Sequence, residues 1–248
     1  MRIITILSLI FLSLISCSCA DSSAKNYALT NMDKGFAVVE LFTSEGCSSC
    51  PPADNAVAKL LKQHDENVYV LSYHVDYWDY LGWKDIFSNA AYTQLQREYA
   101  KKFKLSSVYT PQIIVNGTEQ FVGSDENKLN AAVAKNLQQA STTKLVIDAK
   151  ASNEKITVNY STDAANAKLK LALIQLSAED KIQRGENSGA TLHHVNIVRD
   201  IQTVAASAND KVVLNIPASL DVKNCRVVAF TQNINDSKIT AATEVSIQ

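Results

Sequence analysis

Hydrophobic and polar positions follow two periodicities in the first half of the chain. Nearly continuous apolar and β-branched runs over residues 36–43 and 68–75 predict two buried strands. Between them, apolar residues recur at helical spacing: Ala53, Val57, Leu60 and Leu61. The order strand, helix, strand favours a parallel pair, because parallel strands need a crossover connection of this kind.

The following segments continue this alternation. A second helix is predicted by apolar residues that share one face: Tyr92, Leu95, Tyr99 and Phe103. Residues 109–117 predict a turn and a strand that ends in an Asn-Gly dipeptide, which favours a hairpin with residues 119–123. Ser124 then predicts the cap of a last helix, whose apolar face ends at Ala140.

From about residue 142 the pattern changes. Helical periodicity is weak, and short strand-like runs cover residues 145–149, 156–160, 169–176, 195–198, 212–216, 226–230 and 242–247. Short strands at fairly even spacing are typical of a β-sandwich. We therefore expect an α/β domain over residues 35–141, followed by an all-β, sandwich-like domain over residues 142–248.

The N-terminus predicts export from the bacterial cytoplasm. Residues 1–20 combine a basic start, a short apolar run and small residues, as in a secretory signal peptide. The residues before Cys17 resemble a bacterial lipobox and favour lipidation of Cys17, while small residues before Asp21 leave ordinary cleavage as the alternative. Residues 21–34 would form a polar tether. We expect a cell-envelope protein, either a periplasm-facing lipoprotein or a soluble periplasmic or secreted one.

Composition narrows the range of partners. The chain has 24 Lys and Arg against 25 Asp and Glu, and 46% of its residues are hydrophobic, as in ordinary globular proteins. The sequence has no basic stripe, which argues against nucleic acid as a partner. Contact with a membrane is expected only through a lipid anchor.

The five cysteines fall into three groups. Cys17 and Cys19 belong to the leader, Cys47 and Cys50 form a CxxC pair, and Cys225 lies in a strand-like run where it is expected to be a small buried hydrophobe. A CxxC pair can persist as a disulfide in an oxidising envelope. A zinc site made of two such pairs is disfavoured, because the sequence has no second pair.

The position of the CxxC pair predicts its chemistry. It lies between a predicted strand and a predicted helix, where the helix dipole and free N–H groups favour the thiolate of Cys47. A thiolate attacks disulfides, and Cys50 is close enough to attack the mixed disulfide that results. The spacing therefore predicts Cys47 as nucleophile and Cys50 as resolving cysteine, with no cofactor beyond their own disulfide.

Over residues 35–140, this order of elements resembles the thioredoxin-like superfamily. The resemblance implies that the Thr110–Pro111 peptide bond is cis, and that this proline lies beside the disulfide and helps to position the substrate. It also implies a buried acid in the strand before the CxxC pair. Glu40 is the nearest candidate for a proton acceptor of Cys50, although it is one residue out of register, and a solvent-facing or salt-bridged Glu40 is the alternative.

A narrower resemblance spans most of the expected mature chain. The motif GCSSCPPAD is similar to that of a secreted bacterial family with a C-terminal β domain, which supports the fold more than any substrate. The matching segments are residues 40–54, 74–79, 109–112, 184–187 and 198–199. Gly46 departs from classical thioredoxins, which usually have a tryptophan before the first cysteine.

His74, Asp76 and Asp79 follow the second strand, at the sheet edge where the CxxC pair is expected. They predict either an accessory site that tunes the thiolate or binds a metal, or a hydrogen-bonded loop, which we favour. Trp78 and Trp83 are expected to be packing aromatics, with a substrate-groove wall as the alternative.

The second half of the chain holds a further group of polar residues. Residues 184–189 predict a turn-rich loop, which precedes a pair of adjacent histidines. Neighbouring side chains on a strand point to opposite faces, so this pair is unsuited to chelating one ion. We expect a structural role, in which Glu186, His194 and Arg199 can dock onto the redox part.

Three functional hypotheses follow. The preferred one is a cell-envelope thiol–disulfide oxidoreductase that acts on protein or small-molecule thiols and disulfides. A copper-binding, thioredoxin-like chaperone using Cys47, Cys50 and His74 is the alternative, because thiolates and imidazole suit copper, although a two-residue spacer counts against it. The third is a non-catalytic binding lipoprotein in which the disulfide only cross-links a turn. This hypothesis is weaker, because a disulfide that closes so short a loop contributes little stability.

Overall fold

The computed structural model describes residues 27–64, 66–218 and 220–248. The predicted leader, with Cys17 and Cys19, lies outside the described residues, and so does most of the predicted tether. In the described part of the tether, Ala28–Leu29 form the short strand β1, which pairs with a strand of the second half, and Thr30 is buried. Within the described ranges, no helix is long and apolar enough to cross a membrane.

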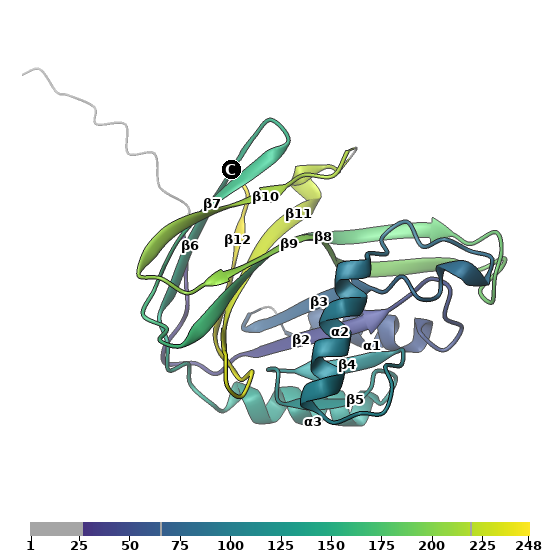
Figure 1. The fold of residues 1–248 in the computed structure, drawn as a ribbon, viewed down its shortest axis with the longest axis horizontal. Helices are drawn as coiled ribbons and strands as arrows, with labels where there is room; N and C mark the ends of the chain where they lie inside the picture. The colour runs from purple at the N-terminus through teal and green to yellow at the C-terminus, as the bar shows by residue number, and fades with distance from the viewer. Residues whose placement is uncertain (1–26, 65, 219) are drawn as a thin grey trace, which may run out of the picture.

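The first half alternates strands and helices as the sequence predicts (Figure 1). The elements are β2 (Ala37–Thr43), α1 (Pro51–Gln63), β3 (Val68–His74), the 3-10 helix η1 (Asp79–Leu81), α2 (Ala90–Lys102), β4 (Gln112–Val115), β5 (Glu119–Val122) and α3 (Glu126–Leu137). The parallel β2–β3 pair and the β4–β5 hairpin are confirmed. Asp125, rather than the predicted Ser124, caps α3, because its carboxylate accepts a hydrogen bond from the N–H group of Lys128.

The second half is built of strands, with one short 3-10 helix. The elements are β6 (Leu145–Ser152), β7 (Lys155–Thr162), β8 (Ala167–Lys181), β9 (Thr191–Ala205), β10 (Asn209–Asn215), η2 (Val222–Asn224), β11 (Cys225–Asn233) and β12 (Ile239–Ser246). The β8 and β9 strands are each 15 residues long. They form a hairpin that extends well beyond the apolar runs from which they were predicted.

Strands from both halves of the chain belong to one sheet. Its eight strands have the order β12-β11-β8-β9-β3-β2-β4-β5, and a parallel contact between Ser72 of β3 and Ile197 of β9 joins the halves. A separate antiparallel sheet has the order β1-β6-β7-β10. The fold is therefore mixed α/β with an additional four-stranded sheet. The expected all-β, sandwich-like domain is therefore not a separate sheet structure. Four of its strands, β8, β9, β11 and β12, extend the sheet of the α/β part.

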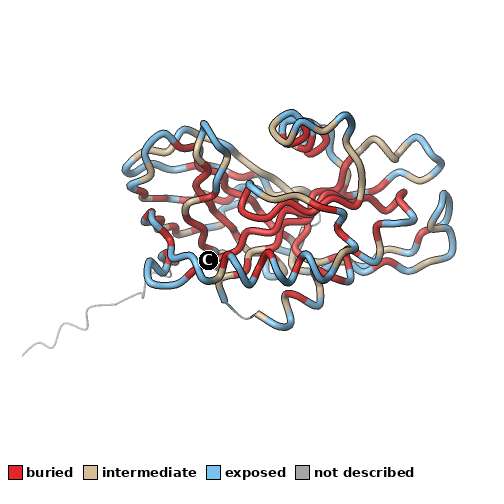
Figure 2. The backbone as a smooth tube through the Cα atoms, turned by 90° about the horizontal axis from the view of Figure 1, so that it is seen from below, coloured by how far each residue is buried: buried red, intermediate tan, exposed pale blue. Residues whose placement is uncertain are grey.

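Both faces of the eight-stranded sheet are buried, as Figure 2 shows for its central strands. Helices α1 and α3 cover one face at the β2–β4 end, and the four-stranded sheet covers the same face at the β8–β12 end. Helix α2 packs on the opposite face. On β8, Leu171 packs toward the four-stranded sheet, whereas its neighbour Ala172 packs on the α2 side. The two faces are thus covered by different elements, and a site beside α1 lies on the opposite face of the sheet from a site beside α2.

Candidate functional site

Cys47 and Cys50 occupy the turn between β2 and α1. Their Sγ atoms lie 2.26 Å apart, at disulfide-bonding distance. Cys50 immediately precedes α1, and Pro51 and Pro52 fill the first helical positions, where a missing N–H group removes no helical hydrogen bond. Both cysteines are 0% exposed, although the two serines between them are exposed. A substrate therefore cannot reach the disulfide without a local movement of the chain.

Thr110 and Pro111 lie against this turn. The peptide bond between them is cis, and the Thr110 hydroxyl donates a hydrogen bond to Cys47 Sγ over 3.3 Å. The Trp78 indole N–H in turn donates to Thr110 Oγ1 over 2.8 Å. A Cβ atom added to Gly46 would lie 3.0 Å from Trp78 Cβ, so a side chain at position 46 would require Trp78 to shift by a few tenths of an ångström. A tryptophan from the β3–α2 connection thus packs beside the position where classical thioredoxins carry one.

Asp54 is a buried carboxylic acid one helical turn after the disulfide. Its backbone N–H donates to the Cys50 carbonyl over 3.2 Å, and its carboxylate accepts a hydrogen bond from Thr43 Oγ1, also over 3.2 Å. Burial raises the pKa of Asp54 to about 7, and the nearby His194 offsets part of this rise. A group that titrates near neutral pH is suited to proton exchange. The sequence analysis missed this residue, although its helical spacing from Cys50 was visible.

Glu40 is also completely buried, but it points to the other face of the sheet. The Tyr99 hydroxyl, on α2, donates a hydrogen bond to its carboxylate over 2.5 Å. Along β2, Thr43 faces α1 and Asp54, whereas Glu40 faces α2, because side chains alternate along a strand. The structure therefore places the Asp54 carboxylate with Thr43 on the α1 face, one helical turn from Cys50, and it places Glu40 with Tyr99 on the α2 face.

Four residues beside the redox turn form a buried carboxylate–histidine cluster: Glu45, His74, Asp85 and His194. His74 Nδ1 lies 2.6 Å from Asp85 Oδ2, and His194 Nε2 lies 3.3 Å from Glu45 Oε1. The two imidazole rings are 4.8 Å apart, and Asp85 also accepts a hydrogen bond from the Glu45 N–H. Burial raises the pKa of Asp85, but the adjacent His74 and backbone N–H groups outweigh burial and lower it overall. This cluster fixes the chain just before Cys47.

The group predicted from the sequence is divided between two places. His74 belongs to the buried cluster, whereas Asp76 and Asp79 hold the loop after β3. Asp76 accepts a hydrogen bond from Thr93 Oγ1 over 2.5 Å, and Asp79 accepts one from Ser88 Oγ over 2.7 Å. The favoured interpretation, a hydrogen-bonded loop, fits these two aspartates. Asp85, which the sequence analysis did not single out, is the actual partner of His74.

The loop between β8 and β9 reaches the redox turn from the second half of the chain. Glu186 Oε2 accepts hydrogen bonds from the Ser48 N–H and hydroxyl groups, over 3.1 and 2.7 Å. Asn187 Nδ2 donates to the carbonyl oxygens of Glu45 and Cys47, over 2.7 and 3.1 Å. We call Glu186 and Asn187 the clasp. It holds the exposed side of the CxxC turn.

The remaining sequence candidates make no hydrogen bond to the redox turn among the described residues, although Arg199 does contact the first half of the chain through Phe87. Arg199 stacks over the Phe87 ring, with 4.9 Å between its guanidinium carbon and the ring centre. Cys225 is buried and free, and burial raises its pKa to about 11. In the part of the chain that the structure describes, no three His, Cys, Asp or Glu side chains are grouped so as to hold a metal ion.

The chain matches a described protein family and one solved structure over most of its length. Residues 38–232 match the family "Protein of unknown function (DUF1223)". The crystal structure of protein AGR_C_4864 from Agrobacterium tumefaciens is 31% identical, with a TM-score of 0.60, and the match covers 84% of this chain and 93% of that one.

A domain of the outer membrane lipoprotein Omp28 from Porphyromonas gingivalis is more remote. It is 16% identical, with a TM-score of 0.31, over 44% of this chain and 89% of that domain. This similarity is too low to support a conclusion about fold or function. No curated protein matches the chain. Since the family match covers well over half of the chain, including the redox turn and the clasp, the chain belongs to the DUF1223 family.

Proposed function

We propose that this protein is a thiol–disulfide oxidoreductase of the bacterial cell envelope. The observation that carries the proposal is the environment of the disulfide: a CxxC pair at the start of α1, with the Thr110 hydroxyl on Cys47 Sγ and the ionisable Asp54 one turn beyond Cys50. The resemblance to the thioredoxin-like superfamily supports the same conclusion, as does the predicted export signal. Protein or small-molecule thiols and disulfides are the proposed partners.

The proposed reaction moves two electrons between a substrate dithiol and the Cys47–Cys50 disulfide. A substrate thiolate attacks Cys47 Sγ, a mixed disulfide forms, and Cys50 leaves as a thiolate. The second substrate thiolate then attacks the substrate sulfur of the mixed disulfide and releases Cys47 as a thiolate. The substrate becomes a disulfide, and its two protons end on the two cysteines. The reverse sequence reduces a substrate disulfide.

Asp54 is the proposed proton donor and acceptor for Cys50. The departing Cys50 thiolate needs a proton, and Asp54 lies one helical turn away in a site with little water. Because burial raises the pKa of Asp54 to about 7, the carboxyl group is partly protonated at neutral pH and can deliver that proton. In the reverse direction, the same carboxylate removes the proton from Cys50.

The clasp controls access to the disulfide in this proposal. Both cysteines are buried, and the exposed Ser48 beside them is bound by Glu186. Release of Glu186 and Asn187 from the turn would expose Cys47 while leaving Cys50 at the N-cap position of α1. A substrate would then meet the nucleophilic cysteine first, which is the order that the reaction requires.

Mixed-disulfide trapping tests the proposal in cells. In a Cys50→Ser variant the resolving thiol is missing, so covalent complexes between Cys47 and substrate proteins should accumulate. The matched control is Cys47→Ser, which keeps one cysteine in the turn but lacks the nucleophile and should trap far less. Cys225→Ser should behave as the unmodified protein, because Cys225 lies outside the site.

The purified protein provides the second arm of the test. A glutathione titration should convert the Cys47–Cys50 pair reversibly between dithiol and disulfide at a defined potential. The proposal fails if Cys50→Ser traps no more partners than Cys47→Ser and the double Cys→Ser protein retains full function in cells. Tight Cu(I) binding by the reduced protein would instead favour the copper hypothesis, although His74 Nδ1 is already held by Asp85.

A further inference from the structure

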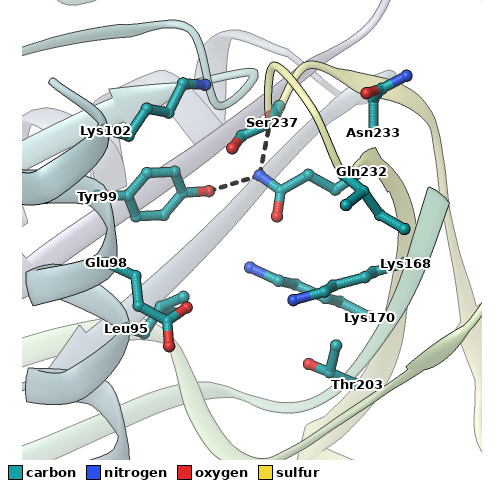
Figure 3. Close-up of a pocket in the computed structure, with 11 residues that line it drawn as sticks. Leu95, Glu98, Tyr99, Lys102, Lys168, Lys170, Thr203, Gln232, Asn233 and Ser237 are labelled. Atoms are coloured by element: carbon teal, nitrogen blue, oxygen red, sulfur yellow. Dashed lines mark hydrogen bonds between the residues drawn. The ribbon is translucent and has the colours of Figure 1, made fainter. Parts of the chain in front are cut away.

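A groove lies between α2 and the β8, β9 and β11 strands, on the sheet face opposite α1 (Figure 3). Its first cavity has a volume of about 280 Å³. We call it the α2 groove, and the side chains that matter here are Leu95, Glu98, Lys168, Lys170, Thr203 and Gln232. None of these residues contributes to the redox turn or to the clasp.

Lys170 is a buried cation that points into this groove (Figure 3). Its side chain extends from β8, and the residue is only 5% exposed. Its Nζ lies 5.6 Å from the ring centres of both Tyr99 and Phe230. Within the described ranges, Lys170 has no hydrogen bond or ion pair with another side chain. A buried ammonium group without such a partner is unfavourable, and an anion in the groove would compensate it.

The other charges of the groove also favour an anion. Lys168 lines the same cavity, and so does Lys102, whose Nζ already donates to the carbonyl oxygens of Gly117 and Asp236. Glu98 is the one acidic residue among the lining residues in the described chain. Glu40 lies near the cavity, and its carboxylate accepts a hydrogen bond from the Tyr99 hydroxyl. It makes no ion pair with Lys170 within the described residues. Burial lowers the pKa of Lys170, and the charges of Glu40 and Glu98 offset only part of that effect.

The groove continues along α2 into a second cavity of about 340 Å³, which shares Leu95, Glu98, Lys170 and Thr203 with the first. The exposed surface of this second cavity is mainly apolar, with Tyr92 and Ile201 among its walls. One end of the groove therefore carries cations, and the other can take an apolar chain. Volumes of this size suit a small organic ligand.

The polar groups of the groove favour a carboxylate over a phosphate. One buried ammonium balances one negative charge. The amide hydrogens of Gln232 are already donated to the Tyr99 hydroxyl and the Ser237 carbonyl, each over 2.9 Å. Apart from Lys170, the donors that remain in the groove are the Thr203 hydroxyl and the ammonium group of Lys168, which is exposed to water. A dianionic phosphate group would need more buried donors for its acceptor oxygens.

We propose that the α2 groove binds an amphiphilic monocarboxylate, with its carboxylate on Lys170 and its apolar chain along Leu95, Tyr92 and Ile201. The Thr203 hydroxyl is available as a second donor to the carboxylate. This binding function is separate from thiol–disulfide exchange, because the groove and the redox turn lie on different parts of the sheet. It does not depend on the function proposed for the CxxC pair.

Isothermal titration with octanoate tests the proposal on the purified protein. Octanoate should bind at least tenfold more tightly than 1-octanol, which lacks the charge, and than acetate, which lacks the chain. Lys170→Met keeps most of the side-chain volume and should weaken octanoate binding at least tenfold. The matched control is Lys150→Met, an exposed lysine of β6, which should leave the affinity unchanged.

A second variant addresses the apolar half of the groove. Ile201→Trp fills the second cavity without removing Lys170, and it should weaken octanoate at least fivefold while acetate binding stays the same. Circular dichroism and urea unfolding establish that each variant is folded, and this variant decides the test if Lys170→Met does not fold. The proposal is overturned if octanoate binds Lys170→Met as well as the unmodified protein, or if 1-octanol or inorganic phosphate binds more tightly than octanoate.

Discussion

The redox turn and the α2 groove differ in how their buried ionisable groups are paired. Beside the redox turn, carboxylates and imidazoles are buried in pairs, Glu45 with His194 and His74 with Asp85. In the groove, Lys170 is also buried but has no such partner among the described residues, and a cavity lies before it. In the first arrangement each acid lies against a histidine of the chain, although Glu45 Oε1, His74 Nε2 and both ring nitrogens of His194 make no hydrogen bond among the described residues. In the second, the proposed ligand supplies the opposite charge. The contrast separates groups that stabilise the fold from a group that is available for binding.

The largest effect is expected from breaking a pair beside the redox turn. Asp85→Ala removes the partner of His74 and the acceptor for the Glu45 N–H, and leaves both buried polar groups unpaired. We expect the free energy of unfolding to fall by about 3–5 kcal/mol, as for other broken buried ion pairs. Urea denaturation at pH 7 measures this change.

The control for this prediction is Glu66→Ala. Glu66 pairs with Lys34 at the surface, where both side chains are mostly exposed, so the loss should be about 1 kcal/mol or less. Equal losses for the two variants would show that the buried cluster is not a stabilising pair, and the contrast with the α2 groove would disappear.

A second prediction concerns the pH dependence that Asp54 gives to stability. Its pKa is 3.8 in an unfolded chain and about 7 in the folded protein, so between these values the folded state holds the proton more tightly. Stability should therefore fall as pH rises from 4 to 7. The loss is on the order of 3 kcal/mol, since each pKa unit corresponds to about 1.4 kcal/mol.

Asp54→Asn tests this assignment, because an asparagine keeps the acceptor for Thr43 but does not titrate. Urea denaturation between pH 4 and pH 7 should give a markedly flatter stability profile for the variant. An unchanged slope would place the titrating group elsewhere and would also weaken the proton-transfer role of Asp54.

Much of the redox turn could be predicted from the sequence, because its signals are local. The CxxC pair and the prolines at the start of α1 lie within a few residues of one another. The Thr110–Pro111 step is 63 positions from Cys47, and it was predicted from the resemblance to the thioredoxin-like superfamily. For the buried acid, the resemblance made Glu40 the nearest candidate, one residue out of register, and Glu40 is indeed buried. The register of β2 instead turns Glu40 toward Tyr99, and a helical position supplies Asp54.

Long-range parts of the site could not be predicted in the same way. The clasp residue Glu186 is 138 positions from Ser48 along the chain, and no local pattern links the two residues. The same holds for β8, whose apolar run indicated a strand but not its partners. Within that run, residues 171–174 are apolar at successive positions, which is a pattern of strands buried on both faces. This was the available signal that β8 lies inside a covered sheet.

The clasp provides a kinetic prediction. Glu186→Ala removes both hydrogen bonds to Ser48, and the turn should open more often. We expect the disulfide to be reduced by dithiothreitol about threefold to tenfold faster, as expected for the loss of modest, solvent-exposed hydrogen bonds. Tryptophan fluorescence can follow the reaction, because Trp78 packs against the redox turn.

Glu179→Ala is the matched control for the clasp. Glu179 lies on the same hairpin, and its one ion pair within the described chain is with the exposed His193. Removing the Glu179 side chain should therefore leave the reduction rate unchanged. If both variants accelerate reduction equally, access to the disulfide depends on the hairpin as a whole. The hydrogen bonds between Glu186 and Ser48 would then not control it.

The smallest effect is expected at the rim of the α2 groove. Lys168 lines the cavity beside Lys170 but is exposed, so its attraction for a carboxylate is screened by water and salt. Lys168→Met should weaken octanoate binding about twofold to threefold at low salt, and change the free energy of unfolding by less than about 0.5 kcal/mol. The difference in affinity should shrink in 1 M salt, whereas the effect of Lys170→Met should persist, because a buried charge is screened much less. A larger effect at Lys168 than at Lys170 would move the carboxylate to the rim, and Lys170 would then be a buried group without a ligand.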